Sequence, residues 1–329
     1  MTENGTELAV HGDTIPAVEG GDILPTRADQ NAAAVYLAGL AQGSRRTMRG
    51  ALDSIARLAG GSDALSFPWA ALRFQHTAAI RAELQASGMN YNTVNKHLWA
   101  MRGVLKAAWQ LGQMTAEDYY RAAAVESVKG ESLLAGRAIT SGEITALMDA
   151  CAADPSPAGA RDGAVIGLLY GCGLRRAELV SLDLADYDPT GPTLAVRSGK
   201  GNKSRSIPVG TNGLAAALGD WLAVRGSEPG PLFWALKRPN TGKRLTTQAV
   251  YKILQKRAAE AGVSELSPHD FRRTFVGDLL DAGADVVTVQ KLAGHSSVNT
   301  TARYDRRPES AKRKAVELLH VPYRRRRVR

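Results

Sequence analysis

Six side chains in the second half of the sequence are of types that bind, attack or protonate a phosphate ester. In chain order they are Arg175, Lys200, His269, Arg272, His295 and Tyr304. Guanidinium and ammonium groups neutralise phosphate oxygens. Ammonium and imidazole groups can also transfer protons. A tyrosine phenol can attack phosphorus and conserve the bond energy in a covalent phosphotyrosine. Because the unperturbed pKa of the phenol is about 10, its attack at neutral pH needs assistance from neighbouring groups.

The local spacing places these side chains at helix starts and in a tight turn. Arg175 opens a helix after a glycine, where the positive end of the helix dipole favours an anion, and Glu178 follows on the same face. His269 and Arg272 are three residues apart, so they converge on one helical face. Glycines on both sides of Lys200 allow the positive φ of a hairpin turn. Taken singly, each segment is more typical of a surface ion pair or an exposed turn.

Together, the four segments resemble the tyrosine recombinase (phage integrase) family, and within it the Xer-like bacterial branch. The matching stretches are Gly-Leu-Arg175-Arg-Ala-Glu178-Leu, Gly-Lys200-Gly-Asn-Lys, His269-Asp-Phe-Arg272-Arg-Thr-Phe, and Leu-Ala-Gly-His295-Ser-Ser with Thr301-Ala-Arg-Tyr304. Two departures fall outside the catalytic positions: Cys172 stands where a Thr is common, and Phe271 replaces the usual Leu. The resemblance covers the chain from about Arg27 to its C-terminus.

The resemblance implies a site-specific DNA recombinase or integrase that cuts and rejoins strands through a Holliday junction, with no metal, ATP or cofactor. Tyr304 would be the nucleophile, forming a 3′-phosphotyrosyl link and freeing a 5′-hydroxyl. Arg175 and Arg272 would stabilise the charge of the pentacoordinate transition state in place of a metal ion.

The same resemblance implies roles for the other residues of the set. Lys200 would be the general acid that protonates the departing 5′ oxygen. His269 would bind phosphate and accept a proton, and His295 would donate a second hydrogen bond. Glu178 would support Arg175 without taking part in the chemistry.

The sequence divides into five parts, and the resemblance suggests a role for the larger ones. They are an acidic leader at 1–26, a helical core-binding (SAM-like) domain at 27–128, a linker at 129–138, an α+β catalytic domain at 139–308, and a C-terminal helix with a basic tail at 309–329. The leader has five acidic residues and no Lys or Arg, which is typical of disorder. Thr140 with Glu143 is a capping box and marks the first helix of the second domain. The two domains would form a C-shaped clamp on DNA.

Apolar periodicity predicts mostly helices, with one region of short strands. The clearest helical face is formed by Val94, Leu98, Met101, Leu105 and Ala108. Further helices are expected at 29–42, 44–58, 75–87, 115–125, 213–224, 247–261, 270–281, 286–292 and 309–319. Strands are expected at 184–187, 194–197 and 205–209. The expected fold class is therefore mainly α with a small antiparallel β-sheet.

Charge and composition narrow the class of partner. The chain has 42 Lys and Arg against 32 Asp and Glu, a net charge of +10, which suggests nucleic acid or an anionic membrane. The longest apolar run, at 164–174, is shorter than the roughly 20 residues that span a bilayer, and no secretory signal precedes it. Two cysteines are too few for a disulfide framework. These features favour a cytoplasmic protein with no membrane partner, and the resemblance implies that it is bacterial and nucleoid-associated.

The resemblance implies two kinds of partner: double-stranded DNA with inverted-repeat core sites, and further copies of the chain in a homotetramer. The alternative is a tetramer shared with a second recombinase. Nine cations are the expected DNA contacts: Arg45, Arg46, Lys96, Arg102, Lys203, Arg205, Lys252, Lys256 and Arg257. Residues 309–319 are the expected segment passed to a neighbouring protomer. The alternative for this segment is a helix that packs on its own domain.

Two rival functions fit parts of the pattern. A type IB topoisomerase resembles this family in using a similar Arg, Lys, His and Tyr set. The helical first domain, the Gly-Lys200-Gly turn and the Leu-Ala-Gly-His295 motif favour a recombinase. The second rival is a DNA-binding regulator with an inactive remnant of the site, but every catalytic position is filled.

Overall fold

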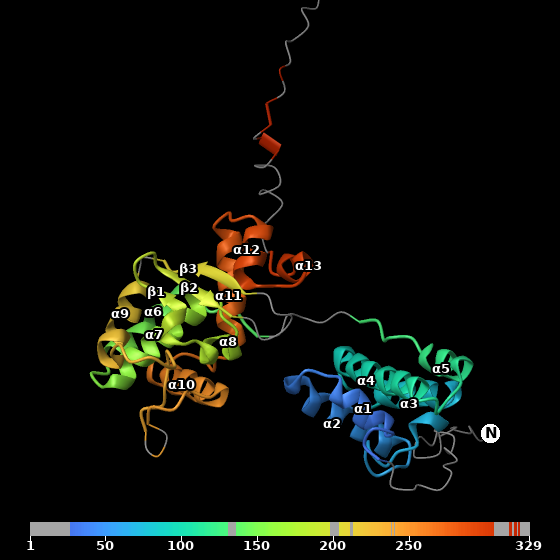
Figure 1. The fold of residues 1–329 in the computed structure, drawn as a ribbon. Coiled ribbons are helices and arrows are strands. Elements are labelled where there is room, and N and C mark those ends of the chain that lie inside the picture. Colours follow the sequence, from blue (N-terminus) through green and yellow to red (C-terminus); the bar gives the residue numbers. More distant parts are fainter. Residues whose placement is uncertain are drawn as a thin grey trace, which may run out of the picture. The chain divides into compact units, whose positions relative to one another are not determined.

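The computed structural model describes residues 27–130, 136–197, 204–210, 213–237, 239, 241–305, 316–317, 319–320 and 322. The expected acidic leader, the basic tail, Lys200 and Lys203 therefore lie outside the described residues, as does most of the segment 309–319. The chain forms two compact units, Met1–Leu133 and Leu134–Arg329 (Figure 1). The expected fold class is confirmed, because both units are mainly helical and one small antiparallel sheet is present. No helix among the described residues is long and apolar enough to span a membrane.

The first unit is a helical bundle arranged around one long helix. Its helices are α1 (Ala32–Ala38), α2 (Gln42–Leu58), α3 (Phe74–Ala86), α4 (Tyr91–Gln110) and α5 (Ala116–Ala123). The predicted apolar face of α4 is buried, and α4 packs against all four other helices. The first helix is shorter than predicted because Asn31 caps its start, accepting from Ala34 N at 3.0 Å, and the chain turns at Gly39.

The second unit surrounds one apolar helix, α7. Its helices are α6 (Ser141–Ala152), α7 (Pro157–Gly171), α8 (Arg176–Ser181), α9 (Leu214–Arg225), α10 (Thr247–Glu260), α11 (Pro268–Asp281), α12 (Val286–Ala293) and α13 (Val298–Ala302). α7 is buried along most of its length and packs against α6, α9 and α11. The predicted capping box is present, since the Thr140 side chain accepts from Glu143 N and the Glu143 carboxylate accepts from Thr140 N.

The sheet has three short strands in the order β1 (Tyr187–Asp188), β2 (Thr193–Val196) and β3 (Arg205–Pro208), all antiparallel. Leu194 pairs with Ile207, and both side chains enter the core. The start of the first predicted strand is wrong. Residues 184–186 instead form a 3-10 turn, because Asp183 N donates to the Asp186 carboxylate at 2.9 Å and closes it.

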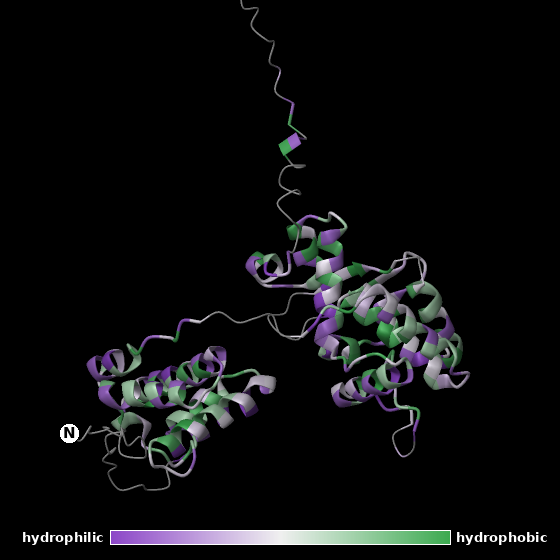
Figure 2. Ribbon diagram, turned by 180° about the vertical axis from the view of Figure 1, so that it is seen from behind, coloured by the Kyte–Doolittle hydropathy of each residue, from purple (hydrophilic) through white to green (hydrophobic). Residues whose placement is uncertain are grey.

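A separate small cluster fills the space between α11, α12 and α13, which are grouped next to β3 (Figure 1). Its buried members are Phe275, Val276, Leu280, Val289, Ala293 and Tyr304. Figure 2 shows apolar and polar residues mixed along most of the helices, which is typical of helices that bury one side. This cluster fixes the end of α12 and the chain after α13, which carry His295 and Tyr304.

Candidate active site

Three consecutive backbone carbonyls at the C-terminal end of α12 each accept a hydrogen bond from a different arginine. The carbonyl of Leu292 accepts from Arg205 Nε at 3.0 Å, that of Ala293 from Arg272 Nη2, and that of Gly294 from Arg175 Nη2 at 2.8 Å. The last carbonyls of a helix have no partner within it and lie at the negative end of its dipole. The three guanidinium groups satisfy them, so segments far apart in the sequence meet here.

Arg175 stands at the N-terminal cap of α8 and shares the Glu178 carboxylate with Arg205. Its backbone N–H donates to Glu178 Oε2 at 2.9 Å, and its Nη1 donates to Oε1 at 2.7 Å. Burial alone would raise the pKa of Glu178, but hydrogen bonds from Arg205 and from the Arg175 backbone lower it to about 2. The Arg175 side chain is still 46% exposed, so its guanidinium is accessible to an anion.

Arg272 lies on α11 with its side chain almost fully buried. Nη1 donates to the Gly173 carbonyl at 2.7 Å, so the guanidinium bridges the turn before α8 and the end of α12. Burial lowers the pKa of Arg272 to about 10, and the charge of Arg175 acts in the same direction. The group therefore stays charged at neutral pH. Gly173 has φ +56°, and a Cβ there would lie 2.2 Å from the Phe275 ring, so only glycine fits.

His295 and Tyr304 lie together after α12. Their ring centroids are 6.3 Å apart with an interplanar angle of 18°. Nδ1 of His295 is 2.8 Å from the hydroxyl of buried Thr301, which orients the ring and leaves Nε2 for another partner. Tyr304 is only 7% exposed, and its phenol is close enough to Arg272 to influence the pKa of that guanidinium.

His269 is the second residue of α11 and is exposed. Its charge lowers the pKa of His295, so the two rings lie within electrostatic range of each other. Asp270 beside it is buried: one carboxylate oxygen accepts from Ser267 N and Oγ at 2.7 Å, and the other from Arg137 N at 2.8 Å. The structure thus groups Arg175, His295 and Tyr304 with the two residues of the His-x-x-Arg motif.

Sequence reasoning missed three parts of this arrangement: the role of Thr301, the accepting carbonyls, and the internal contacts of Arg205. Thr301 belongs to α13, a helix of five residues that is too short to show a periodic pattern. The three accepting carbonyls are backbone groups, which carry no residue-type signal. Arg205 was expected only as a DNA contact, but all three of its guanidinium nitrogens donate within the protein.

The expectation that Arg257 contacts DNA is wrong. Its side chain is 1% exposed and pairs with carboxylates on three sides. Nε donates to Asp162 at 2.9 Å, Nη2 to Asp154 at 2.7 Å, and Nη1 to Glu260 at 2.8 Å. Lys256 is half exposed and pairs with Asp154 and Glu260, which lowers its value as a phosphate contact. The helical pattern showed a positive charge but not the acidic residues that surround it.

We expect Arg257→Met to lower the free energy of unfolding by about 2–4 kcal/mol, because buried Asp162 keeps Arg161 at one carboxylate oxygen but loses its cation at the other, and Asp154 also loses a partner. Lys252→Met, at an exposed position of the same helix, is the matched control and should change it by less than about 0.5 kcal/mol. Urea denaturation measures both. Equal stability of the two variants would contradict the structural role assigned to Arg257.

The remaining expected DNA contacts of the first unit lie on α2 and α4. Arg45 and Arg46 are exposed, and Arg45 donates to the carbonyls of Ala38 and Leu40. Lys96 is half-buried on α4.

Arg102, also on α4, donates to the Val125 carbonyl. The expected contact Lys252, on α10 of the second unit, is exposed. Acidic residues are absent from α4, so its charged side chains, Lys96, Arg102 and Lys106, are all cations.

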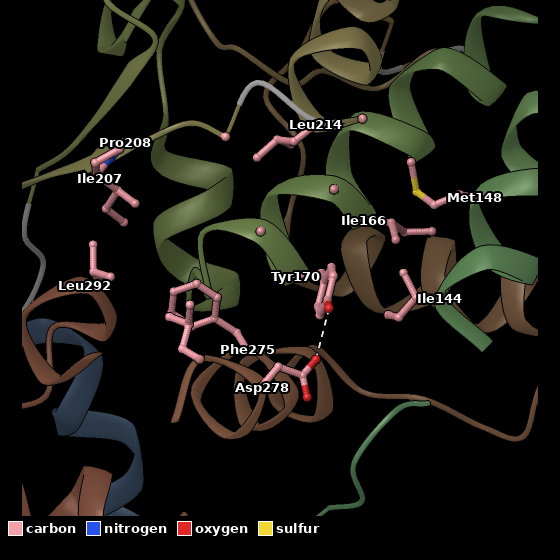
Figure 3. A pocket seen from close by; sticks show the side chains of 15 residues that line it. Ile144, Met148, Ile166, Tyr170, Ile207, Pro208, Leu214, Phe275, Asp278 and Leu292 are labelled. Atoms are coloured by element: carbon pink, nitrogen blue, oxygen red, sulfur yellow. Dashed lines mark hydrogen bonds between the residues drawn. The ribbon is translucent and has the colours of Figure 1, made fainter. Parts of the chain in front are cut away.

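An apolar groove of about 610 Å³ opens on the second unit, and none of the arginines described above lines it. Ile144 and Met148 of α6 form one wall, and Phe275 and Leu292 lie opposite (Figure 3). Tyr170 lies between the walls and donates its hydroxyl to Asp278 at 3.0 Å.

The His295 ring makes stability depend on pH. Burial lowers the pKa of His295 from 6.5 to about 4, and the charges of Arg272 and Arg175 add to the effect. Between these values the unfolded chain binds a proton that the folded chain does not, so the free energy of unfolding should fall as pH drops from 6.5 toward 4. His295→Gln should remove that part of the pH dependence, as measured by denaturation at several pH values. An NMR titration midpoint of His295 at or above 6.5 would contradict this assignment.

Comparison with known proteins places this site in a family. The model of the phage integrase family matches residues 137–310. The chain is 33% identical over 245 residues to tyrosine recombinase XerC of Alcanivorax borkumensis, covering 73% of this chain and 76% of that protein. It is also 33% identical over 276 residues to tyrosine recombinase slr0733 of Synechocystis sp., covering 80% and 85%.

Solved structures show the same fold at low identity. One is the Tn1549 transposon integrase in complex with transposon right end DNA, with a TM-score of 0.65, 18% identity, and coverage of 88% of this chain and 99% of that one. Another is the XerH recombinase bound to palindromic difH substrate, with a TM-score of 0.62, 18% identity, and coverage of 92% and 98%. From its sequence relatives, its family match and its fold, the chain belongs to the phage integrase family and is a Xer-like tyrosine recombinase.

Proposed function

We propose that this chain is a site-specific DNA recombinase or integrase that works through a covalent 3′-phosphotyrosyl intermediate. One observation carries the proposal: Arg175 and Arg272 converge on successive carbonyls at the end of α12, with Tyr304 packed beside them. Family membership supplies the reaction class, and this convergence supplies the chemical groups that the reaction needs.

In the cleavage step, the phenolic oxygen of Tyr304 attacks phosphorus and the bond to the 5′ oxygen breaks. Two guanidinium groups face the charge that builds on the non-bridging oxygens. Arg175 approaches them from an exposed helix cap. Arg272 approaches them from a buried position on α11, where the low dielectric strengthens its interaction with an anion. The strand freed at its 5′-hydroxyl then attacks a partner phosphotyrosine, so exchange proceeds through a Holliday junction without ATP.

Proton transfer accompanies both bond changes. His269 takes the phenolic proton, and Lys200 protonates the departing 5′ oxygen. His295 donates from Nε2 to a non-bridging oxygen, which requires the Thr301 hydroxyl to donate to Nδ1. Lys200 lies outside the described residues, so its role rests on the motif alone.

The proposed substrate is double-stranded DNA with inverted-repeat core sites, met in the bacterial cytoplasm at the nucleoid. The first unit would act as the core-binding domain and grip the backbone through α2 and α4. Exposed Arg45 and Arg46 and the acid-free sequence of α4 support this assignment. The second unit would carry the catalysis. DNA is present in the solved XerH and Tn1549 integrase structures, which share this fold.

We further propose that residues 309–319 of one protomer enter the apolar groove of the next, giving a tetramer on two DNA sites. The groove is lined mainly by apolar side chains, and the segment supplies matching ones. Its last five residues include the apolar Ala315, Val316, Leu318 and Leu319. Val316 and Leu319 are exposed in the single chain, so each would gain from burial in a neighbour.

Ile144→Glu should block this assembly, because it places a charge in the groove. Wild-type protein is expected to form tetramers with two site-bearing duplexes in analytical ultracentrifugation, whereas the variant should stop at single-duplex complexes. Thr145→Glu, exposed on the same helix, is the matched control and should assemble normally. Assembly of the Ile144→Glu variant at wild-type concentrations would rule out this use of the groove.

Strand exchange tests the proposed function itself. Binding sites are first selected from a randomised duplex library and then placed as a pair on a supercoiled plasmid. We expect deletion or inversion of the DNA between them, according to site orientation. Relaxation without exchange would indicate a topoisomerase, and binding without cleavage would indicate a regulator; either result would contradict the proposal.

A further inference from the structure

The side chain of Arg205 connects two of the four motif segments by hydrogen bonds, the one that contains Glu178 and the one that contains Leu292. It starts β3 and is 15% exposed, with every guanidinium nitrogen engaged. Nη1 and Nη2 donate to the two oxygens of Glu178 at 3.0 and 2.9 Å, and Nε donates to the Leu292 carbonyl. Such a bidentate pair fixes both distance and plane, because the fork of the guanidinium matches the two carboxylate oxygens.

Glu178 transmits this constraint to Arg175. The carboxylate is 12% exposed and accepts four hydrogen bonds, two from Arg175 and two from Arg205. With Arg205 in place, the plane of the carboxylate is set, and so is the direction of the Arg175 guanidinium. Without it, half of the hydrogen bonds to a nearly buried carboxylate would be lost.

The second arm of Arg205 reaches the end of α12. The Leu292 carbonyl precedes those of Ala293 and Gly294, which hold Arg272 and Arg175. Gly294 has φ +63°, and a Cβ there would lie 2.8 Å from Arg205 Nη1 and 2.9 Å from Cζ. The guanidinium therefore packs directly on this glycine, and a side chain at 294 would displace it.

We propose that Arg205 is a positioning residue for DNA cleavage, acting through Glu178 on Arg175 and not by contact with DNA. This inference rests on the proposed function, because it concerns the rate of phosphotyrosine formation. Arg205 aligns the arginines that bind the phosphate.

Single-turnover cleavage of a nicked duplex carrying a selected site, at saturating protein, tests the proposal. We expect Arg205→Met to slow formation of the covalent adduct at least about 100-fold, with the Kd for DNA and its salt dependence unchanged. Arg197→Met is the matched control: this arginine directly follows the neighbouring strand β2, is 72% exposed and pairs only with Asp186 among the described residues. It should cleave at the wild-type rate.

A duplex with sulfur as the bridging 5′ atom separates two modes of action. Its leaving thiolate needs no proton, so this substrate relieves a defect in the general acid but not one in the arginines. We expect the same loss of rate for Arg205→Met on both duplexes. Arg205→Lys should also be slow, because an ammonium cannot make the bidentate pair.

Several results would overturn the proposal. One is cleavage at the wild-type rate by Arg205→Met, and another is recovery of its rate on the sulfur duplex. A third is full activity of Arg205→Lys. The fourth is weaker DNA binding by Arg205→Met, with the slope of log K against log salt reduced by about 1 and normal cleavage at saturation. If Arg205→Met does not fold, the double variant Arg205→Met with Glu178→Gln removes the unpaired charge. It is expected to show the same loss of cleavage rate, at least about 100-fold relative to the wild type. Absence of an adduct with the wild-type protein would instead refute the proposed function, a distinct result.

Discussion

Tyr304→Phe is expected to abolish covalent attachment to DNA, with cleavage reduced by at least about 10⁴-fold, because it removes the attacking oxygen. The ring itself remains, so its packing against Phe275 and Ala293 is preserved. The free energy of unfolding should therefore change by less than about 1 kcal/mol. DNA affinity should also stay the same, since the phenol is nearly buried in the free protein. Denaturing gels with a labelled nicked duplex measure the adduct.

Tyr170→Phe is the matched control for this loss. Tyr170 is another partly buried tyrosine of the same unit, but its hydroxyl donates to Asp278 in the apolar groove and not at the arginines. It should form the adduct at the wild-type rate. If Tyr304→Phe still forms an adduct, another residue is the nucleophile.

Arg272→Lys is expected to lower the cleavage rate by about 10²–10³-fold. The guanidinium spans two carbonyls, of Gly173 and Ala293, and a single ammonium cannot reproduce that planar bridge. Burial lowers the pKa of Arg272 itself to about 10, and it would lower the pKa of a lysine from an already smaller value, favouring the neutral amine. Both effects remove charge stabilisation from the transition state.

Arg244→Lys controls for the loss of a carbonyl-bridging arginine elsewhere. Arg244 donates to the carbonyls of Val180 and Leu182 and pairs with Asp183. Its substitution should change stability modestly and leave the rate constant of cleavage within about threefold of the wild type. A comparable loss of rate in both variants would mean that general destabilisation, and not the site, explains the effect of Arg272→Lys.

The sequence predicted the local features of this structure well, because they depend on neighbouring residues. The capping box of Thr140 and Glu143 is an example, as is the apolar face of α4. Expected strands that carried alternating patterns were found close to their predicted positions. In contrast, a 3-10 turn replaced part of one strand, since a hydrogen bond from Asp183 N to the Asp186 carboxylate overrode the propensity of the segment.

The parts that the sequence did not predict depend on tertiary contacts. Arg205 and Arg257 look like surface cations in the sequence, but the structure pairs Arg205 with Glu178 of α8, and Arg257 with Asp162 of α7 and with Asp154. Charge alone does not indicate burial. Glu178 was expected to support Arg175. The structure adds that its carboxylate accepts two hydrogen bonds from Arg175 and two from Arg205.

The most direct test of the proposed function is to identify the covalent bond itself. A nicked duplex carrying a selected site is incubated with wild-type protein, the adduct is digested with trypsin, and the DNA-linked peptide is sequenced by mass spectrometry. The proposal predicts one modified residue, Tyr304, joined to a 3′-phosphate, with a free 5′-hydroxyl on the released strand. A link to any other residue, a 5′-phosphate link, or no adduct on a site that the protein binds tightly would contradict it.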